Sequence, residues 1–284
     1  ITIHDLILTK FPSRRASTLA PLLYWFKNLA YRVVISRAVK QAKMIIAVSE
    51  FTKQDLVQQL NVSPEKIKVI YNGLSTLPLN SPYDFKADRD ILLRYNIKTP
   101  YWLYVGSAYP HKNLEWLVQL FIRWSKKHSG YQLVLVGEHD YFYERLIKFI
   151  VDLSKRERVG DIICPGFVPD ESLAALYRQA AVYVFPSRYE GFGLPPLEAM
   201  SYGCPVLASD SSCLPEILGP AAVYFKDNDM ESALTAMEKI LRNENYRQRF
   251  IALGFEQIKK YNWDNCAQET LKIYQQVLFH NVYK

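Results

Sequence analysis

The chain has 284 residues, of which 49% are hydrophobic and 22% charged, with a formal net charge of +7. This composition excludes an intrinsically disordered chain, and the length is sufficient for two domains. No uncharged apolar run reaches the roughly 18 residues that a membrane-spanning helix needs. The cysteines Cys164, Cys204, Cys213 and Cys266 show neither C-x-x-C pairs nor metal-type spacing. We interpret them as buried thiols in a reducing, cytoplasmic compartment.

The positive charge is concentrated near the N-terminus. Residues 1–53 contain nine basic and two acidic side chains, so the rest of the chain is balanced. The basic residues are Lys10, Arg14, Arg15, Lys27, Arg32, Arg37, Lys40, Lys43 and Lys53. A basic surface attracts phosphate groups on nucleotides, lipid headgroups or nucleic acid, but it can also serve solubility alone.

The first 90 residues predict part of an α/β unit. We expect a short strand over 1–8, which contains the dipeptide "HD", and a helix over 17–43. A buried strand follows at 44–49, where Ser49 is placed to cap a helix from Glu50 to Leu60. A strand at 68–73 ends in the turn signal Asn72-Gly73. Residues 74–90 carry two prolines and no periodicity, which indicates a linker.

Strands and helices then alternate. Strands are expected at 101–107, 131–137, 161–166, 182–187, 205–210 and 221–225, helices at 113–128, 141–158, 170–179 and from Pro195, and a helical tail from Asp229, interrupted at 261–264. Continuous apolar strands indicate a parallel sheet that is buried on both faces, so the fold class is α/β with a doubly wound, Rossmann-like domain. The expected division is a partial N-terminal domain (1–78), a linker (79–97), a second domain (98–260) and a final helix (261–284).

The segment "SRYEGFGLPPLEAMSYGCPVLASD" (187–210) places two carboxylates around a helix start. In doubly wound sheets ligands bind beyond the carboxyl ends of the strands. Gly191 and Gly193 let backbone N–H groups approach a ligand, and the following helix start favours negative charge. Glu190 and Glu198 would repel phosphate but accept strong hydrogen bonds from sugar hydroxyls. The segment therefore suits a nucleotide sugar; alternatively, the two acids have only local structural roles.

Lys112 stands at the turn between the strand at 101–107 and the next helix. A lysine beside a helix N-terminus is a candidate contact for phosphate. In the sheet order expected for a Rossmann-like domain, this loop and the loop of Glu190 share one edge.

The motifs "HD", "AVSEFTK", "VIYNG", "YVGS", "HKN" and "YEGFGLPPLEAM" followed by "GCPVLAS" resemble those of the retaining nucleotide-sugar glycosyltransferases of family 4. The resemblance covers nearly the whole chain and implies a GT-B fold of two Rossmann-like domains, the N-terminal one incomplete, with the final helix crossing back to it. It implies transfer of a hexose, with mannose favoured, from a GDP- or UDP-sugar to a hydroxyl of a glycan or a lipid-linked saccharide.

The same resemblance assigns roles to residues. His4, Lys112 and Glu190 would be catalytic: His4 in the cleft, Lys112 on the diphosphate and Glu190 on the transferred sugar. Glu198 would bind the ribose. The other donor-binding positions, around the sugar, the diphosphate and the base, would be Ser107, Gly166, Phe167, Val168, Gly191, Phe192, Gly193 and Leu194.

Two departures from the family pattern stand out. Many members have an arginine where this chain has Ser107, and we expect Arg188 or His111 to supply the missing cation. Members also have a longer N-terminal domain before "HD", with a glycine-rich loop near the donor. We expect the leaving phosphate oxygen to act as the base. The histidines are scattered, so no metal or other cofactor is expected.

Several alternatives stay open. The chain could be a nucleotide-sugar-binding protein that has lost catalysis, or a nucleotide-sugar epimerase. Nucleic-acid binding is not expected, because no recognised module is present. In "PLLYWFKNLAYR" (21–32) we expect Leu22, Leu23 and Phe26 in the core, but the segment could also rest on an anionic membrane or line an acceptor groove.

Overall fold

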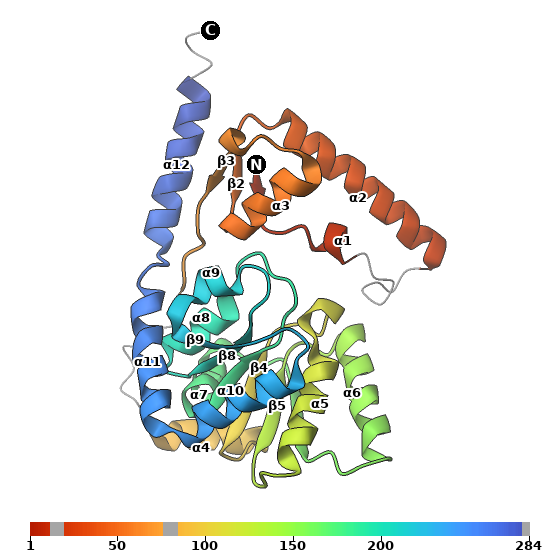
Figure 1. Cartoon of the computed structure of the whole chain (residues 1–284), viewed down its shortest axis with the longest axis vertical. Helices are drawn as coiled ribbons and strands as arrows, with labels where there is room; N and C mark the ends of the chain where they lie inside the picture. The colour runs from red at the N-terminus through yellow and green to blue at the C-terminus, as the bar shows by residue number, and fades with distance from the viewer. Residues whose placement is uncertain (12–19, 76–84, 280–284) are drawn as a thin grey trace.

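A computed structural model describes residues 1–11, 20–75 and 85–279 and contains two parallel sheets (Figure 1). The smaller sheet has the order β1-β2-β3, with β1 (Thr2–Ile3), β2 (Ile45–Ala47) and β3 (Ile67–Val69). The larger sheet has the order β6-β5-β4-β7-β8-β9. Its strands are β4 (Tyr101–Val105), β5 (Gln132–Val136), β6 (Asp161–Gly166), β7 (Val182–Phe185), β8 (Val206–Ser209) and β9 (Ala222–Phe225). The α/β prediction is confirmed.

The strand order of the larger sheet is that of the dinucleotide-binding Rossmann domain. From β4 the chain adds β5 and β6 on one side of the sheet, and from β7 it adds β8 and β9 on the other side. A topological switch point therefore lies between the neighbouring strands β4 and β7. Strand β4 lies inside the sheet, and its residues Tyr101, Trp102, Leu103 and Tyr104 are all fully buried. Helices on both faces exclude water from such a strand. Loops that follow β4 and β7 therefore form the expected ligand edge.

Helices of the larger unit pack against one another. Contacts join α5 (Leu114–Ser125) to α6 (Tyr141–Ser154) and to α10 (Met230–Arg242). Other contacts join α8 (Leu194–Ser201) to α11 (Glu244–Ile258). The remaining elements are α7 (Asp170–Gln179), α9 (Leu214–Leu218), and the short 3-10 turns η3 (Pro110–Lys112) and η4 (Gly219–Ala221). The expected helical tail is broken between α10 and α11 at Asn243, whose side chain accepts from the backbone N–H of Tyr246 (2.9 Å).

The expected strand over 1–8 is wrong beyond Ile3. After His4 the chain turns, and residues Ile7–Lys10 form the short helix α1. The cause is local: Oδ1 of Asp5 accepts a hydrogen bond from the backbone N–H of Ile7 (3.0 Å). This turn of the Asx type offers the backbone an alternative to the sheet ladder.

Helix α2 (Pro21–Gln41) lies largely outside the core. Leu22, Leu23 and Phe26, which we expected to be buried, are 69%, 59% and 54% exposed. Only the second half of α2 packs on the small sheet, where Val39 joins its core, so the first half projects away from it (Figure 1). The expected helix start at Ser17, like Arg14 and Arg15, lies outside the described residues.

Helix α3 (Glu50–Leu60) begins as predicted. Oγ of Ser49 accepts from the backbone N–H of Thr52 (3.1 Å), and the helix ends at Asn61 in the left-handed region. A 3-10 turn, η2 (Pro64–Lys66), then leads into β3.

The expected linker over 79–97 contains a helix. Helix α4 (Phe85–Arg94) packs against α7, and the guanidinium of Arg178 donates to both carboxylate oxygens of the buried Asp88 (2.9 and 2.5 Å). Because the partner that stabilises α4 lies 90 residues further along the chain, local periodicity did not indicate this helix. Residues 79–84 lie outside the described part.

The two units meet again at the start of α12 (Trp263–Phe279). A Cβ on Gly73 would lie 2.4 Å from the backbone nitrogen of Trp263, and the indole of Trp263 donates to Oγ of Ser75 (2.9 Å). Only glycine permits this approach. From there α12 runs up beside the smaller sheet (Figure 1), without burying a residue of its own. Among the described helices, none has the length and apolar character that crossing a membrane requires.

Candidate active site

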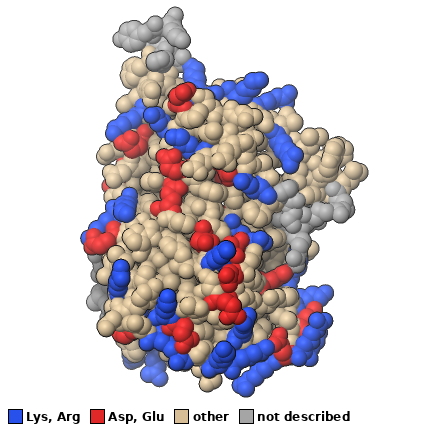
Figure 2. Space-filling view, in the orientation of Figure 1, with Lys and Arg blue, Asp and Glu red and all other residues tan. Residues whose placement is uncertain are grey.

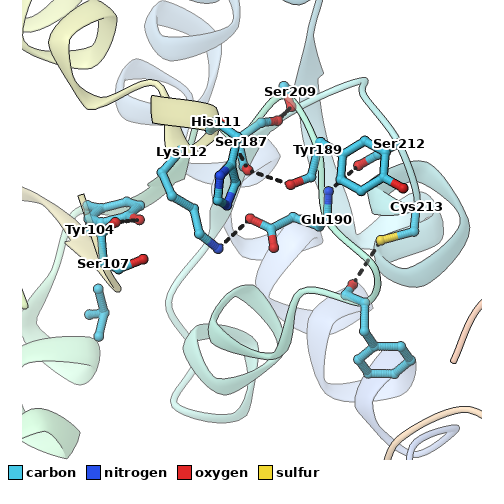
Figure 3. Close-up of polar contacts among 12 residues, drawn as sticks. Tyr104, Ser107, His111, Lys112, Ser187, Tyr189, Glu190, Ser209, Ser212 and Cys213 are labelled. Carbon is cyan, nitrogen blue, oxygen red and sulfur yellow. Dashed lines mark hydrogen bonds and ion pairs between the residues drawn. The ribbon is translucent and has the colours of Figure 1, made fainter. Parts of the chain in front are cut away.

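The loops after β4 and β7 are joined by hydrogen bonds at the switch point. The backbone N–H of Arg188 donates to the carbonyl of His111 (2.8 Å), and Oγ of Ser187 donates to the same carbonyl (3.3 Å). Ser187 in turn accepts at its own carbonyl from Oγ of Ser209, at the end of β8. The ends of three strands therefore share one rigid polar framework (Figure 3).

Lys112 and Glu190 form an ion pair on this framework. Nζ of Lys112 lies 2.6 Å from Oε1 of Glu190, and the two side chains are 16% and 10% exposed (Figure 3). The ammonium also lies 5.5 Å from the ring centroid of Phe185, a cation–π distance. The structure thus brings together two predicted catalytic residues that are 78 positions apart in the sequence.

The Glu190 loop is held from its other side by the segment before α9. The backbone N–H of Glu190 donates to Oγ of Ser212 (3.0 Å). Two residues later the thiol of Cys213 contacts the carbonyl of Phe192 (3.3 Å). Ser212 was not predicted as a site residue, because no motif in the sequence marks a side chain that acts on a backbone 22 residues away.

The N-terminus of α8 offers fewer donors than we expected. Gly193 occupies the cap position in the left-handed region (φ 91°), and α8 has no side-chain cap. Pro195 and Pro196 lack N–H groups, so Leu194 is the only one of the first three helical residues that can donate. An anion at this place would therefore depend on the amides of the 191–194 loop rather than on a full helix turn.

Glu198 lies in α8 and is half-buried. Its Oε2 accepts a hydrogen bond from the hydroxyl of Tyr177 in α7 (3.0 Å). Burial raises the pKa of the Glu198 carboxyl above its ordinary value, and the Tyr177 hydrogen bond partly opposes this shift. Tyr177, which no sequence motif singled out, therefore fixes the orientation of this carboxylate.

His4 reaches the site through its backbone. A Cβ on Gly191 would lie 1.8 Å from the carbonyl oxygen of His4, so the two loops are in direct contact. Oγ1 of Thr52 donates weakly to the same oxygen (3.3 Å). The His4 side chain is exposed.

The residues expected around the nucleotide base differ in their exposure to solvent. Gly166 adopts a left-handed conformation (φ 83°) at the end of β6. The next side chain, Phe167, is 72% exposed and free to meet a ligand, whereas Val168 is buried in the core. Ser107 offers its carbonyl to the hydroxyl of Tyr104 (2.8 Å).

Neither stand-in for the missing arginine is a free cation here. Burial, together with the charge of Lys112, lowers the pKa of His111 to about 4, so this imidazole is neutral at pH 7. Arg188 is paired with Asp227 (3.3 Å) and 41% exposed. Lys112 is therefore the cation that the predicted site supplies in this state.

A cavity of about 600 Å³ lies between the first two helices and the loop after β4. Its lining includes Asp5, Lys27, Tyr109, His111 and Arg188. Lys112 and Glu190 lie outside this lining, so the cavity flanks the ion pair rather than contains it. Within the described residues, no group of three or more His, Cys, Asp or Glu side chains is arranged to hold a metal ion.

Two known protein families match this chain. The family described as "Glycosyl transferases group 1" matches residues 88–257, and "Glycosyltransferase Family 4" matches residues 1–76. The chain belongs to the group 1 glycosyltransferases. Its relatives include O-antigen chain mannosyltransferase B of Escherichia coli, 31% identical over 84% of this chain and 62% of that protein. Another is O-antigen chain mannosyltransferase RfbU of Salmonella typhimurium, 30% identical over 94% of this chain and 67% of that one.

Solved glycosyltransferase structures confirm the GT-B fold of this chain. Sucrose-phosphate synthase from Thermosynechococcus elongatus superposes with a TM-score of 0.77 at 26% identity, over 98% of this chain and 67% of that one. Anabaena HepE, solved in complex with UDP and glucose, superposes with a TM-score of 0.74 at 18% identity, over 97% and 71% of the two chains. The chain spans about two thirds of the length of the two mannosyltransferases and of the sucrose-phosphate synthase.

Proposed function

We propose that this chain forms part of a retaining glycosyltransferase that moves a hexose from a GDP- or UDP-sugar to a hydroxyl of a glycan or lipid-linked saccharide. Mannose is the favoured sugar, because two relatives at about 30% identity are named mannosyltransferases. The observation that carries the proposal is the Lys112–Glu190 pair at the switch point of a Rossmann sheet. A cation and a carboxylate at that edge match a diphosphate joined to a polyol.

In the free protein the side chains of Lys112 and Glu190 already hold each other in place, 2.6 Å apart. On donor binding, Lys112 would share its charge with the diphosphate, and Glu190 would accept hydrogen bonds from the hydroxyls of the sugar. Glu198 would accept hydrogen bonds from the ribose hydroxyls, either in place of the hydrogen bond from Tyr177 or together with it. Preorganised charge of this kind stabilises a developing anion without reorganisation during the reaction.

In a transfer with retention, the nucleoside diphosphate leaves from the same face of the sugar that the acceptor hydroxyl attacks. The bond between the anomeric carbon and the phosphate oxygen breaks, the acceptor oxygen bonds to the same carbon, and the acceptor proton passes to the leaving phosphate. Lys112 would stabilise the negative charge on that phosphate. We also propose that the reaction needs no metal ion, which predicts full activity after treatment with a chelator.

The test is a mass-spectrometric assay of the full-length protein with GDP-mannose, UDP-glucose and a panel of glycan acceptors. Glu190→Gln should lower kcat/KM by about 100-fold or more. Glu171→Gln, at an exposed acid of α7, is the matched control and should leave kcat/KM unchanged. Donor binding without turnover would instead support a catalytically inactive binding protein. Release of an altered sugar nucleotide without acceptor would support an epimerase.

We further propose that the first half of α2 contacts an anionic membrane, where lipid-linked acceptors are found. Leu22, Trp25, Phe26 and Leu29 recur at helical spacing and are all about half or more exposed. The helix carries four basic residues (Lys27, Arg32, Arg37 and Lys40) and no acid. Figure 2 shows the projecting tip of α2 as an uncharged area. An apolar stripe flanked by cations suits an anionic bilayer surface.

Sedimentation with vesicles tests this contact. Vesicles that contain anionic phosphatidylglycerol should retain the protein at low salt, and Trp25→Ser combined with Phe26→Ser should abolish retention. Neutral phosphatidylcholine vesicles are the control. Equal retention by both vesicle types, retention by neither, or self-association through α2 would contradict a membrane role.

A further inference from the structure

Tyr189 extends from the loop of Glu190 into the N-terminal unit. It is 3% exposed, and its ring makes edge contacts with Phe11 (5.7 Å between centroids) and Phe51 (5.3 Å). Its hydroxyl donates to Oδ2 of Asp55 in α3. The residue before the predicted sugar ligand is therefore anchored in the opposite domain.

Asp55 is a buried carboxylate, 3% exposed. Its other oxygen, Oδ1, accepts from the amide of Gln59 (3.1 Å) and lies 3.2 Å from Nζ of Lys10. A buried carboxylate needs such donors, and removing one costs the protein part of its stability. Of these three partners, Tyr189 is the one that comes from the donor-site loop.

The residue after Glu190 is held by the same helix. Oγ of Ser49, the cap of α3, donates to the carbonyl of Gly191 (2.7 Å). The first turn of α3 is itself bound by the larger unit, because the carboxylate of Glu216 accepts from the backbone N–H groups of Glu50 (2.7 Å) and Phe51 (3.0 Å). Helix α3 therefore fixes the chain on both sides of Glu190.

We infer that Asp55 is a positioning residue for the transfer reaction, acting through Tyr189 to hold Glu190 at the donor sugar. The inference rests on the proposed function, and it adds that the acceptor-side domain completes the donor site. Within the larger unit, Lys112 and Ser212 hold Glu190 itself, while α3 sets its two neighbours. A misplacement of roughly 1 Å in a reacting geometry costs about 100-fold in rate.

The experiment compares Tyr189→Phe and Asp55→Asn with Gln59→Ala in the full-length protein. Gln59→Ala is the matched control, because it removes a donor to the same carboxylate on the side that does not touch the loop. We expect kcat to fall about 10- to 100-fold in the first two variants, with KM for the donor changed less than about threefold. The control should keep kcat within about twofold. Hydrogen exchange of the amides of residues 190–193 should accelerate in the first two variants only.

A variant that lacks both partners separates positioning from stability. Asp55→Leu combined with Tyr189→Phe leaves no carboxylate without its donor, so the protein should regain the thermal stability that either single change loses. We expect kcat to remain low. Recovery of kcat together with stability would overturn the inference, as would unchanged exchange of residues 190–193 in Tyr189→Phe.

Failure of the proposed function has a different signature. If the unaltered protein turns over no nucleotide sugar, the proposed function fails. The exchange rates of residues 190–193 then decide alone whether Asp55 holds the loop: acceleration in Tyr189→Phe but not in Gln59→Ala supports it, and equal rates refute it.

Discussion

Nζ of Lys112 and Oε1 of Glu190 lie 2.6 Å apart across the switch point of the larger sheet. Each side chain comes from a loop that follows a different parallel strand, and the two loops are joined by the hydrogen bond between Arg188 and the carbonyl of His111. Because both side chains are largely buried, neither can be removed without leaving the other charge poorly compensated.

Lys112→Ala should therefore affect stability and catalysis together. We expect the free energy of unfolding to fall by about 1–3 kcal/mol, because Glu190 loses a charged donor. We expect kcat/KM to fall about 100- to 1000-fold, because the leaving phosphate loses its cation. Urea denaturation and steady-state kinetics measure the two effects. Lys155→Ala, at an exposed lysine at the end of α6, is the control and should change neither.

Gly191→Ala should separate the two units at the site. The added Cβ would overlap the carbonyl oxygen of His4, and neither atom can rotate away, because the backbone fixes the position of a Cβ and the oxygen is itself a backbone atom. We expect loss of activity by at least about 100-fold and a larger radius of gyration in small-angle scattering. Gly191 does not have a positive φ, so the effect of this change comes from the overlap and not from backbone strain. Gly130→Ala, at a glycine with no neighbour within 4 Å, is the comparison and should keep the activity and the radius of gyration. An active, compact Gly191→Ala protein would show that this contact is dispensable.

Glu198 should make stability depend on pH. Its pKa is raised in the folded protein by burial, so ionisation is easier in the unfolded chain. This group's contribution to stability is present below its ordinary pKa of 4.5 and is lost as pH rises through the folded value. Glu198→Gln should therefore be more stable than the unaltered protein at pH 8, with a difference that shrinks toward pH 4. Equal stability differences at both pH values would contradict this assignment.

His111 has the opposite pH dependence. Its pKa falls from 6.5 to about 4 on folding, so the unfolded chain takes up a proton first as pH falls. Stability should be lost between pH 6.5 and pH 4, by up to about 3 kcal/mol. His111→Asn should flatten this part of the profile, as measured by urea denaturation. His139→Asn, at an exposed histidine, is the control and should retain the full slope.

The sequence allowed prediction of those elements whose signals are local. Strands β4, β5 and β7 to β9 are largely apolar runs, α7 begins and ends at the expected residues, and Ser49 caps α3 as expected. Each of these depends on side chains within a few positions of the element itself.

The parts that the sequence did not indicate depend on distant partners. Helix α4 is stabilised by Arg178, and Tyr177 orients Glu198 from a neighbouring helix. The exposure of Leu22, Leu23 and Phe26 follows from where the small sheet ends, which the spacing of apolar residues along α2 does not encode. The short helix α1 is the exception, because its cause at Asp5 is local, but the apolar run around that residue favoured a strand.

Ligand-observed NMR with a panel of nucleotide sugars tests the central claim most directly. The account predicts saturable binding of a GDP- or UDP-hexose that free GDP or UDP displaces, with affinity reduced by about tenfold or more in Lys112→Ala and in Glu190→Gln and unchanged in Lys155→Ala. Absence of binding by any nucleotide sugar, or equal affinity in all these proteins, would contradict it.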